Sequence, residues 1–307
     1  MTPELTIAVD GLGFPESPVA MTDGTLLFVD IKAQTLLRTH AGGGVDTVAS
    51  LPGGPNGVAI GPDGAAYVCN NGGVYSWQDL PGIGTVPQSP PPPSYAGGSV
   101  QRVDLKTGAV TTLYEQFDGA RLLAPDDLVF DSSGGFWFTD SGLQLLDGTK
   151  HGALYYGTAD GQPLRKAATI PMANGVGLSP DGKTVYVSDT MQGRLWALDI
   201  VGPGQVAPGQ LPVMPGRVIC TLPGFQWLDS LKVEAGGNIC VGTIFNGGIS
   251  VFGPDGSVDH IPVPAVFTTN LCFGGLDLTD VWITASSQNR IYHTVWPRPG
   301  LKLAFQA

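Results

Sequence analysis

The sequence predicts an all-β protein, a six-bladed β-propeller with four antiparallel strands in each blade. Three observations support this fold class. The 307 residues include 45 glycines and 26 prolines but only 13% charged residues, a composition that favours short strands and tight turns over helices. One strand–turn–strand unit recurs six times along the chain, which is typical of propellers. A strand-like segment near the start of the chain can complete the last unit and close the ring.

The repeated unit is a polar residue, a short apolar strand, a Gly-containing turn and a second, more apolar strand. Asp23-Gly24 and Asp63-Gly64 are examples of the turns, and such pairs are strong hairpin signals. Further strand-like segments follow each unit, so that each unit with its followers makes one four-stranded blade. The units begin at Pro15, Pro55, Pro125, Ala173, Leu228 and Thr269.

The two ends of the chain are expected to meet in the sixth blade. Near the C-terminus this blade has only three strand-like segments, the last at residues 289–295. Residues 5–10 form a spare strand-like segment, and we expect it to pair beside residues 289–295, because an unpaired sheet edge promotes aggregation. Residues 1–307 then form a single propeller domain.

A proline-rich insertion at residues 79–98 lengthens the second blade. It falls between the second and third strands of that blade, and such loops emerge on the face where the innermost strands begin. We therefore expect residues 79–98 to overhang this face as a lid that contributes little to the core. A proline-rich surface loop or a partner motif is the alternative.

Charge and cysteine usage restrict the partners and the location of the protein. The formal net charge of −11 excludes nucleic acid and anionic membranes as expected partners, and no feature indicates an oligomeric state. No secretory signal or membrane-spanning stretch is recognisable, so a cytoplasmic location is expected. The cysteines occur singly in apolar segments, which favours free buried thiols over disulfides or zinc ligands. They are Cys69, Cys220, Cys240 and Cys272.

One polar residue stands at the start of every innermost strand when the six units are aligned. Innermost strands line the central channel, so the six side chains are predicted to converge on the axis at one end. Carboxylates that meet in this way repel one another unless a cation lies among them. Carboxylate and amide oxygens favour one Ca²⁺, with Mg²⁺, Mn²⁺ or Zn²⁺ as alternatives. The alternative hypothesis without a metal is a water-filled polar channel. The six residues are Glu16, Asn56, Asp126, Asn174, Asp229 and Asn270.

Several segments make the chain similar to the senescence-marker-protein-30/gluconolactonase family, with paraoxonases and diisopropyl fluorophosphatase as more distant relatives. The segments are FPESPV near the start, the unit openings at Pro125 and Asn174, QWLDSLKVEAGGNICVGT, and TNLCFGG near the end. The resemblance spans essentially the whole chain. It implies a six-bladed propeller that hydrolyses a small lactone or another ester with one bound divalent cation.

The resemblance also implies roles for individual residues. The family holds its metal with positions that match Glu16, Asn174 and Asp229. Its third-blade position is usually Asn and contacts substrate or metal, whereas this chain has Asp126, which adds a negative charge. Some distant relatives bind a second, structural calcium through an acid at the position of Lys232, so that arrangement is not expected here.

Asp229 is the predicted catalytic residue, as a general base toward water or as a direct nucleophile. Substrate contacts are predicted from the remaining ring residues, Asp126, Asn56 and Asn270, and from His151, which follows a second strand on the same face. A serine-hydrolase mechanism has no support, because the motif G-x-S-x-G is absent. Four aromatic residues could wall an apolar pocket, with packing between blades as the alternative. They are Trp77, Tyr95, Trp227 and Phe245.

Two other function classes remain open at this point. The first is a different enzyme on the same site, either another metal-dependent ester or phosphotriester hydrolase or a strictosidine-synthase-like lyase. The lyase is disfavoured because it need not bind a metal, whereas Glu16 and Asp229 supply carboxylates. The second class is a non-enzymatic propeller that binds a ligand or partner, although repeat signatures of WD or kelch type are absent.

Overall fold

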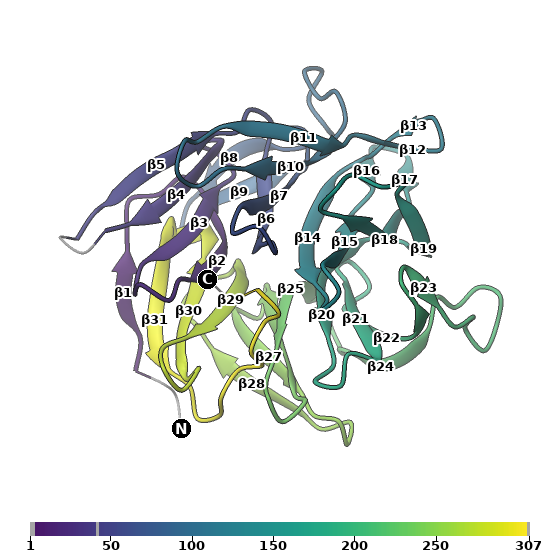
Figure 1. Cartoon of the computed structure of the whole chain (residues 1–307). Helices are drawn as coiled ribbons and strands as arrows, with labels where there is room; N and C mark the ends of the chain where they lie inside the picture. The colour runs from purple at the N-terminus through teal and green to yellow at the C-terminus, as the bar shows by residue number, and fades with distance from the viewer. Residues whose placement is uncertain (1–3, 41–42, 306–307) are drawn as a thin grey trace.

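The computed structural model describes residues 4–40 and 43–305. In this part of the chain the structure contains β-strands and one short 3₁₀ turn, η1 (Ser286–Gln288), but no α-helix. Six four-stranded antiparallel sheets surround a central axis like the blades of a propeller (Figure 1). The predicted fold class is therefore confirmed.

The first three blades follow one another along the chain. In each of these three blades the innermost strand comes first in the chain and the outermost strand comes last. Blade 1 contains β2 (Pro15–Ala20), β3 (Leu26–Asp30), β4 (Thr35–Thr39) and β5 (Val45–Ser50). Blade 2 contains β6 (Pro55–Ile60), β7 (Ala66–Asn70), β10 (Ser99–Val103) and β11 (Val110–Tyr114). Blade 3 contains β14 (Pro125–Phe130), β15 (Gly135–Asp140), β18 (Gly152–Thr158) and β19 (Arg165–Ile170).

The last three blades continue the pattern, and the ends of the chain meet in the sixth. Blade 4 contains β20 (Ala173–Leu178), β21 (Thr184–Asp189), β22 (Arg194–Gly202) and β24 (Arg217–Thr221), with β23 (Gln205–Val206) also paired to β22. Blade 5 contains β25 (Trp227–Val233), β26 (Ile239–Ile244), β27 (Gly248–Phe252) and β28 (Val258–Pro262). Blade 6 contains β29 (Thr268–Gly274), β30 (Asp280–Ala285), β31 (Arg290–Val295) and β1 (Thr6–Val9).

Ring closure occurs as predicted, through the N-terminal strand. β1 pairs antiparallel with β31, and Thr6 lies opposite His293. The pairing covers the edge that β31 would otherwise expose. The observed strand is slightly shorter than the predicted residues 5–10.

The six innermost strands pack against one another around the axis, each on the next and β29 back on β2. Two glycines permit the close approach of neighbouring strands. A side chain on Gly57 would overlap the carbonyl oxygen of Asp126, and one on Gly175 would lie 2.5 Å from the backbone nitrogen of Leu231. Both glycines directly follow a polar residue of the ring, so the narrow channel depends on their lack of a side chain.

Most of the core lies between blades. Val129, Trp137 and Val187, for example, are buried in a cluster shared by blades 3 and 4. The second strands contribute residues that are buried on both faces because a neighbouring blade covers each face. This explains the apolar character of these strands in the sequence.

The proline-rich insertion begins with a hairpin of its own. β8 (Ser76–Leu80) pairs with β9 (Gly84–Gln88), and the hairpin lies between β7 and β10 in the sequence. Its Val86 is only 3% exposed and shares a cluster with Phe14 and Phe267 from blades 1 and 6. The expectation that residues 79–98 contribute little to the core is therefore wrong, because the hairpin reaches over blade 1 and packs there.

Two smaller hairpins form separate two-stranded sheets outside the blades, and the thiols are free. β12 (Gln116–Phe117) pairs with β13 (Ala120–Arg121), and β16 (Leu143–Leu145) pairs with β17 (Gly148–Lys150). All four cysteines are unpaired, and three of them are buried. Among the described residues, no helix is long and apolar enough to cross a membrane.

A buried carboxylate anchors the C-terminal segment to blade 5. Glu234 accepts hydrogen bonds from Trp296 Nε1 at 2.7 Å and from Arg298 at 2.8 Å, and it is buried. Burial acts to raise the pKa of Glu234, but the hydrogen bonds from Arg298, Trp296 and Asn238 outweigh it, so the pKa lies below its usual value. The ionised form is thus the one that stabilises the fold.

This anchor predicts a loss of stability in acid. Because the folded-state pKa of Glu234 is lowered, its contribution is fully present above the unfolded-state value of about 4.3 and is lost as the pH falls through the folded-state value. Glu234→Gln should lower the free energy of unfolding at pH 7 by about 1–3 kcal/mol and flatten its decline below pH 5. Urea unfolding across this pH range measures both effects. The exposed Glu115→Gln is the matched control, and equal pH slopes for Glu234→Gln and wild type would contradict the anchor.

Candidate functional site

A β-bulge at the start of every innermost strand presents the polar ring to the axis. The register of each innermost strand with its neighbour shifts at or directly beside the polar residue in all six blades. A bulge adds a residue on one strand and redirects its side chain. The six side chains Glu16, Asn56, Asp126, Asn174, Asp229 and Asn270 are all buried.

Hydroxyl groups on the second strands of blades 3 and 4 tie these strands to the bulge of the next blade. Ser188 Oγ donates to the Asp229 carbonyl oxygen at 2.6 Å and accepts from the Gly175 N–H at 2.7 Å. Thr139 Oγ1 makes the equivalent bond to the carbonyl oxygen of Asn174. The backbone of the ring is thereby held by contacts between blades as well as within one blade.

Glu16 is held by blade 6 as well as by its own strand. Its Oε2 accepts from Asn270 Nδ2 at 2.8 Å and from the Ser17 N–H at 2.6 Å. Burial raises the pKa of Glu16 to about 7, although the hydrogen bonds from Thr269 and Asn270 favour the ionised form. The hydrogen bond from Asn270 therefore holds the Glu16 carboxylate in place and favours its ionised form.

Asp126 and Asp229 share the same end of the channel with Glu16. Burial raises the pKa of Asp229 well above its usual value, and the charges of Glu16 and Asp126 raise it further. Burial and the Glu16 charge likewise raise the pKa of Asp126, which is 1% exposed. The Oδ1 atom of Asp126 has no hydrogen-bond partner among the described residues. A buried carboxylate oxygen without a partner indicates a missing positive or donor group.

The donor set of this site fits a hard divalent cation. Within the described part of the chain, no group of three or more His, Cys, Asp or Glu side chains could hold a metal ion by itself. A cation at this site would therefore also need amide oxygens, such as that of the buried Asn174, whose Oδ1 lies 3.5 Å from Ser230 Oγ. Oxygen ligands of mixed charge, together with the unpartnered Asp126 oxygen, match the preference of calcium.

A lysine neutralises the next acid along the channel. Lys232 Nζ of blade 5 lies 3.3 Å from Asp127 Oδ2 of blade 3, and the Asp127 side chain is fully buried. Sequence comparison of the units places Lys232 three residues beyond Asp229, deeper in the channel. The ammonium group therefore provides the positive charge at this level.

Tyr75 belongs to the site although sequence analysis did not identify it. Burial raises the pKa of its phenol, and the charges of Asp126, Asp229 and Glu16 raise it further. The phenol therefore lies within electrostatic range of the three carboxylates of the ring. Tyr75 directly precedes the β8–β9 hairpin, just before the insertion expected to cover this face. This position in the sequence could have identified Tyr75 as a candidate.

His151 and Asn56 differ in their placement. Asn56 occupies its ring position and is buried. His151 is exposed after the β16–β17 hairpin, and its charge acts to lower the pKa of Asp189 in blade 4. The structure thus brings six of the seven predicted polar residues together and leaves His151 at the edge of the face.

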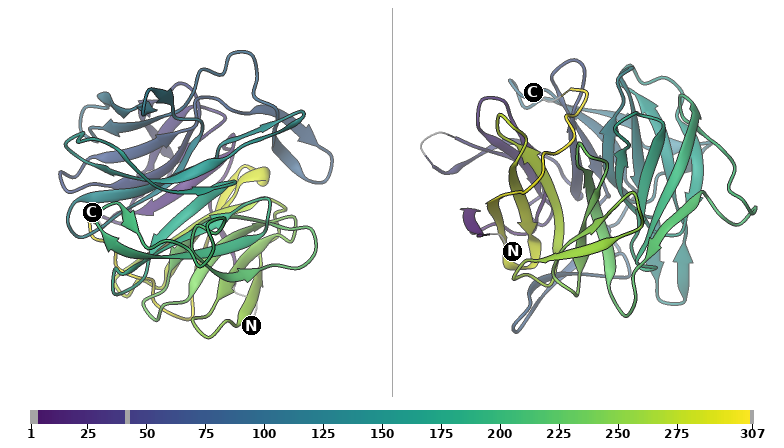
Figure 2. Two further views of the ribbon diagram at one scale, coloured as in Figure 1. Left: turned by 90° about the vertical axis from the view of Figure 1, so that its right-hand side faces the viewer. Right: turned by 90° about the horizontal axis from the view of Figure 1, so that it is seen from below.

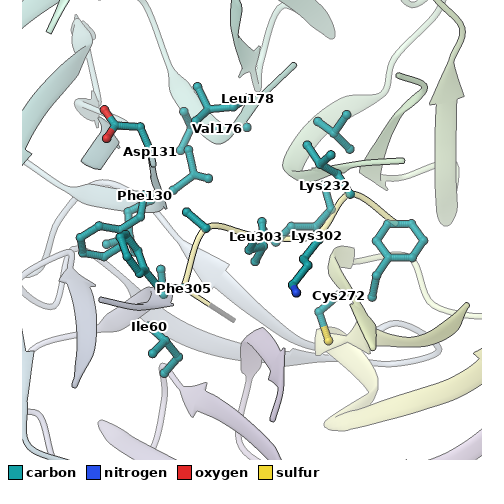
Figure 3. Close-up of a pocket in the computed structure, with 18 of the residues that line it drawn as sticks. Ile60, Phe130, Asp131, Val176, Leu178, Lys232, Cys272, Lys302, Leu303 and Phe305 are labelled. Atoms are coloured by element: carbon teal, nitrogen blue, oxygen red, sulfur yellow. The ribbon is translucent and has the colours of Figure 1, made fainter. Parts of the chain in front are cut away.

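The opposite end of the channel is apolar. A cavity of about 340 Å³ lies where the innermost strands end, and the C-terminal segment crosses it (Figure 3). Ile60, Phe130 and Val176 line it together with Leu303 and Phe305 of that segment. Figure 2 shows the C-terminal end of the chain on one side of the molecule, away from the blue β8–β9 hairpin. The cavity is therefore separate from the carboxylate end.

The fold and the site together define a six-bladed propeller whose channel carries a carboxylate and amide ring at one end. The chain belongs to the SMP-30/gluconolactonase/LRE-like family, whose model matches residues 14–287. This confirms the resemblance found in the sequence. A curated relative is the gluconolactonase of Zymomonas mobilis, which is 27% identical over an alignment of 311 residues. The alignment covers 93% of this chain and 79% of the relative.

Solved structures share the fold. A gluconolactonase from Xanthomonas campestris aligns with a TM-score of 0.74 at 23% identity, covering 96% of this chain and 90% of that one. The calcium-binding protein regucalcin from Agrobacterium tumefaciens aligns with a TM-score of 0.70 at 19% identity, covering 98% of each chain. At these identities the likeness establishes the propeller architecture alone.

Proposed function

We propose that the protein is a metal-dependent lactonase that hydrolyses a small cyclic ester at the polar end of the channel. The observation that carries the proposal is the meeting of three buried carboxylates, Glu16, Asp126 and Asp229, with one Asp126 oxygen lacking a partner. Family membership supports the reaction class, since a relative is a gluconolactonase. The name of the regucalcin neighbour, a calcium-binding protein, supports calcium as the ion.

The residues divide into ligands and supports. Glu16, Asn174 and Asp229 would hold the cation, and Asp126 would be a fourth ligand or a substrate contact. When bound, a divalent cation polarises the ester carbonyl and balances the charge of the tetrahedral oxyanion. Asn270 keeps the Glu16 carboxylate in place through its 2.8 Å hydrogen bond. Asn56 and, at the edge, His151 are candidates for substrate contacts.

Asp229 has the properties of the proton acceptor. Burial and the negative charges of Glu16 and Asp126 raise the pKa of Asp229 in the absence of a cation, and a bound divalent cation would favour the ionised carboxylate that both roles require. This carboxylate either accepts a proton from the attacking water or attacks the carbonyl itself. Both roles require the carboxylate, which is why one substitution tests them together.

The β8–β9 hairpin is the proposed lid of this site. The preceding Tyr75 lies within electrostatic range of the ring carboxylates, and Trp77 on β8 packs on Phe14 with ring centroids 5.0 Å apart. The hairpin also meets blade 6, where Gly84 lies against the Ser287 carbonyl oxygen. In Figure 1 the hairpin lies behind the blades, whereas the C-terminus lies in front.

A hydrolysis screen with and without chelator tests the proposed function. Purified protein is assayed on lactones and aryl esters after EDTA treatment and again after addition of Ca²⁺, Mg²⁺, Mn²⁺ or Zn²⁺. We expect hydrolysis of at least one lactone to fall by more than about 10²-fold with EDTA and to return with one of the ions. Activity on phosphotriesters alone would favour the other hydrolase. No activity and no change with chelator would favour a propeller that only binds a ligand.

A further inference from the structure

Three aromatic rings form a cluster on the face that carries the polar ring. We call Phe225, Trp227 and Phe245 the aromatic platform. The Phe245 ring lies 4.9 Å from that of Phe225 in a tilted arrangement and 5.0 Å from that of Trp227 in a T-shaped arrangement, measured between ring centroids. The first two residues lie at the start of blade 5, and Phe245 follows β26, so all three occupy loops or strand ends on the same face.

The platform is exposed in a way that packing alone does not explain. Phe225 is 75% exposed and Phe245 is 38% exposed, so large parts of both rings face solvent. Phe245 also has a positive φ of 72°, a left-handed conformation that bulky residues rarely adopt. Strained backbone combined with exposed aromatic surface is typical of binding sites.

The platform is continuous with the proposed catalytic site. Trp227 precedes Asp229 by two residues on β25. Phe245 contacts Phe267 of blade 6 at 5.9 Å, and Phe267 contacts Phe14 of blade 1 at 6.4 Å. Aromatic residues thus border the ring on blades 5, 6 and 1.

The other half of the face is built differently. Two residues before the ring residue, where blades 1 and 5 carry Phe14 and Trp227, blades 2, 3 and 4 carry Gly54, Ala124 and Met172. After the second strands, blades 2 and 4 place the buried Asn71 and Thr190. Asn71 Nδ2 and Thr190 Oγ1 have no hydrogen-bond partner among the residues the structure describes.

The two halves of the face therefore differ in the chemical group of a substrate that each can contact. Asn71 Nδ2 and Thr190 Oγ1 are themselves buried, so the half formed by blades 2 to 4 differs from the other half chiefly in lacking aromatic residues at these positions. Phe225 and Phe245 have no hydrogen-bonding atom in their side chains, so hydroxyl groups placed on them would lose bonds to water without replacement. The platform therefore favours an apolar group.

We propose that the aromatic platform binds the apolar substituent of the substrate, so that the preferred substrate is a lactone with an alkyl or aryl side chain rather than a polyhydroxylated sugar lactone. This inference rests on the proposed lactonase function and adds the substrate class. An alkyl or aryl substituent of the lactone that is buried against the platform strengthens binding in proportion to the apolar area removed from water.

Three δ-lactones test the substrate class. They are δ-valerolactone, δ-decalactone, which adds a five-carbon chain, and glucono-δ-lactone. Full burial is worth about fourfold per methylene, so a half-exposed platform should raise kcat/KM for δ-decalactone at least about tenfold over δ-valerolactone. Glucono-δ-lactone should be the poorest of the three. Equal kcat/KM for the two alkyl lactones, or a preference for glucono-δ-lactone, would overturn the inference and leave the lactonase function standing.

Phe225→Ala tests the platform itself. Because Phe225 is largely exposed, the variant should fold, which a thermal melt checks. The preference for δ-decalactone over δ-valerolactone should fall about fivefold or more, through KM. Leu276→Ala removes a fully exposed apolar residue from the β29–β30 turn at the other end of the channel and should change kcat/KM for neither lactone. An unchanged preference in Phe225→Ala would contradict the platform.

A binding measurement separates failure of the inference from failure of the function. If no lactone is hydrolysed with any cation, tryptophan fluorescence can follow binding of the lactam counterpart of δ-decalactone. Binding that Phe225→Ala weakens would support the platform without catalysis, and absence of binding would overturn it. Concentration-dependent self-association that Phe225→Ala abolishes would instead identify the platform as a contact between copies of the chain, which also overturns it.

Discussion

Asp229→Asn is expected to abolish lactone hydrolysis while leaving the propeller folded. The substitution keeps one oxygen for a cation and nearly the same volume, so the surrounding packing is preserved. It removes the proposed proton acceptor or nucleophile, which the repeat register puts at the polar end of the channel. Loss of such a group costs at least about 10²-fold in kcat. The Ser230 N–H, which now donates to Asp229 Oδ1 at 3.0 Å, retains an acceptor in the amide.

The measurement must separate chemistry from cation binding. Activity is compared at saturating cation, with occupancy confirmed by elemental analysis and folding confirmed by circular dichroism. Asn270→Ala is unsuitable as a control because Asn270 donates to Glu16 Oε2. Asp181→Asn, in the exposed β20–β21 turn, makes the same chemical change at the far end of the innermost strands. Near wild-type turnover in fully loaded Asp229→Asn would show that Asp229 is a replaceable ligand.

Lys232→Met is expected to destabilise the fold more than any surface charge substitution. The Asp127 side chain is fully buried, and Lys232 Nζ at 3.3 Å is its ion-pair partner across the channel. Removal of one partner of a buried pair leaves an uncompensated charge and costs about 3–5 kcal/mol. Urea unfolding with EDTA present measures the loss without a contribution from bound cation.

A double-mutant cycle identifies the cause of that loss. Lys232→Met combined with Asp127→Asn removes both charges, and replacement of a whole buried pair is often neutral or stabilising. The double variant should therefore recover most of the stability that Lys232→Met loses. Lys183→Met, at an exposed turn, is the matched control. If Lys232→Met alone remains within about 1 kcal/mol of wild type, the ammonium group does not balance the Asp127 charge.

The repeat pattern predicted the ring because a strand has only two faces and each unit repeats the same order of residues. Once the units are aligned, Glu16, Asn174 and Asp229 occupy the same register, and six equivalent strands around one axis must converge. The bulge at each position was not visible in the sequence. It depends on hydroxyls such as that of Ser188, which bond to the neighbouring blade.

The loops were predicted less well than the strands. His151 was expected at the site because of its place after a second strand, but the intervening β16–β17 hairpin leaves it exposed. Tyr75 was missed, since its approach to the carboxylates depends on how the insertion folds over blade 1. Loop paths follow tertiary contacts, so local sequence carries little information about them.

The order of amino acids alone establishes the fold class, the closure of the ring by residues near the N-terminus and the six polar positions at one end of the channel. These features arise from periodicity and from pairing of a spare strand, which are local or repeated properties. Contacts between blades are decided only when the ring closes. Glu16 meets Asn270 and Asp127 meets Lys232 because the closed ring brings residues far apart in the chain to within hydrogen-bonding or ion-pair distance.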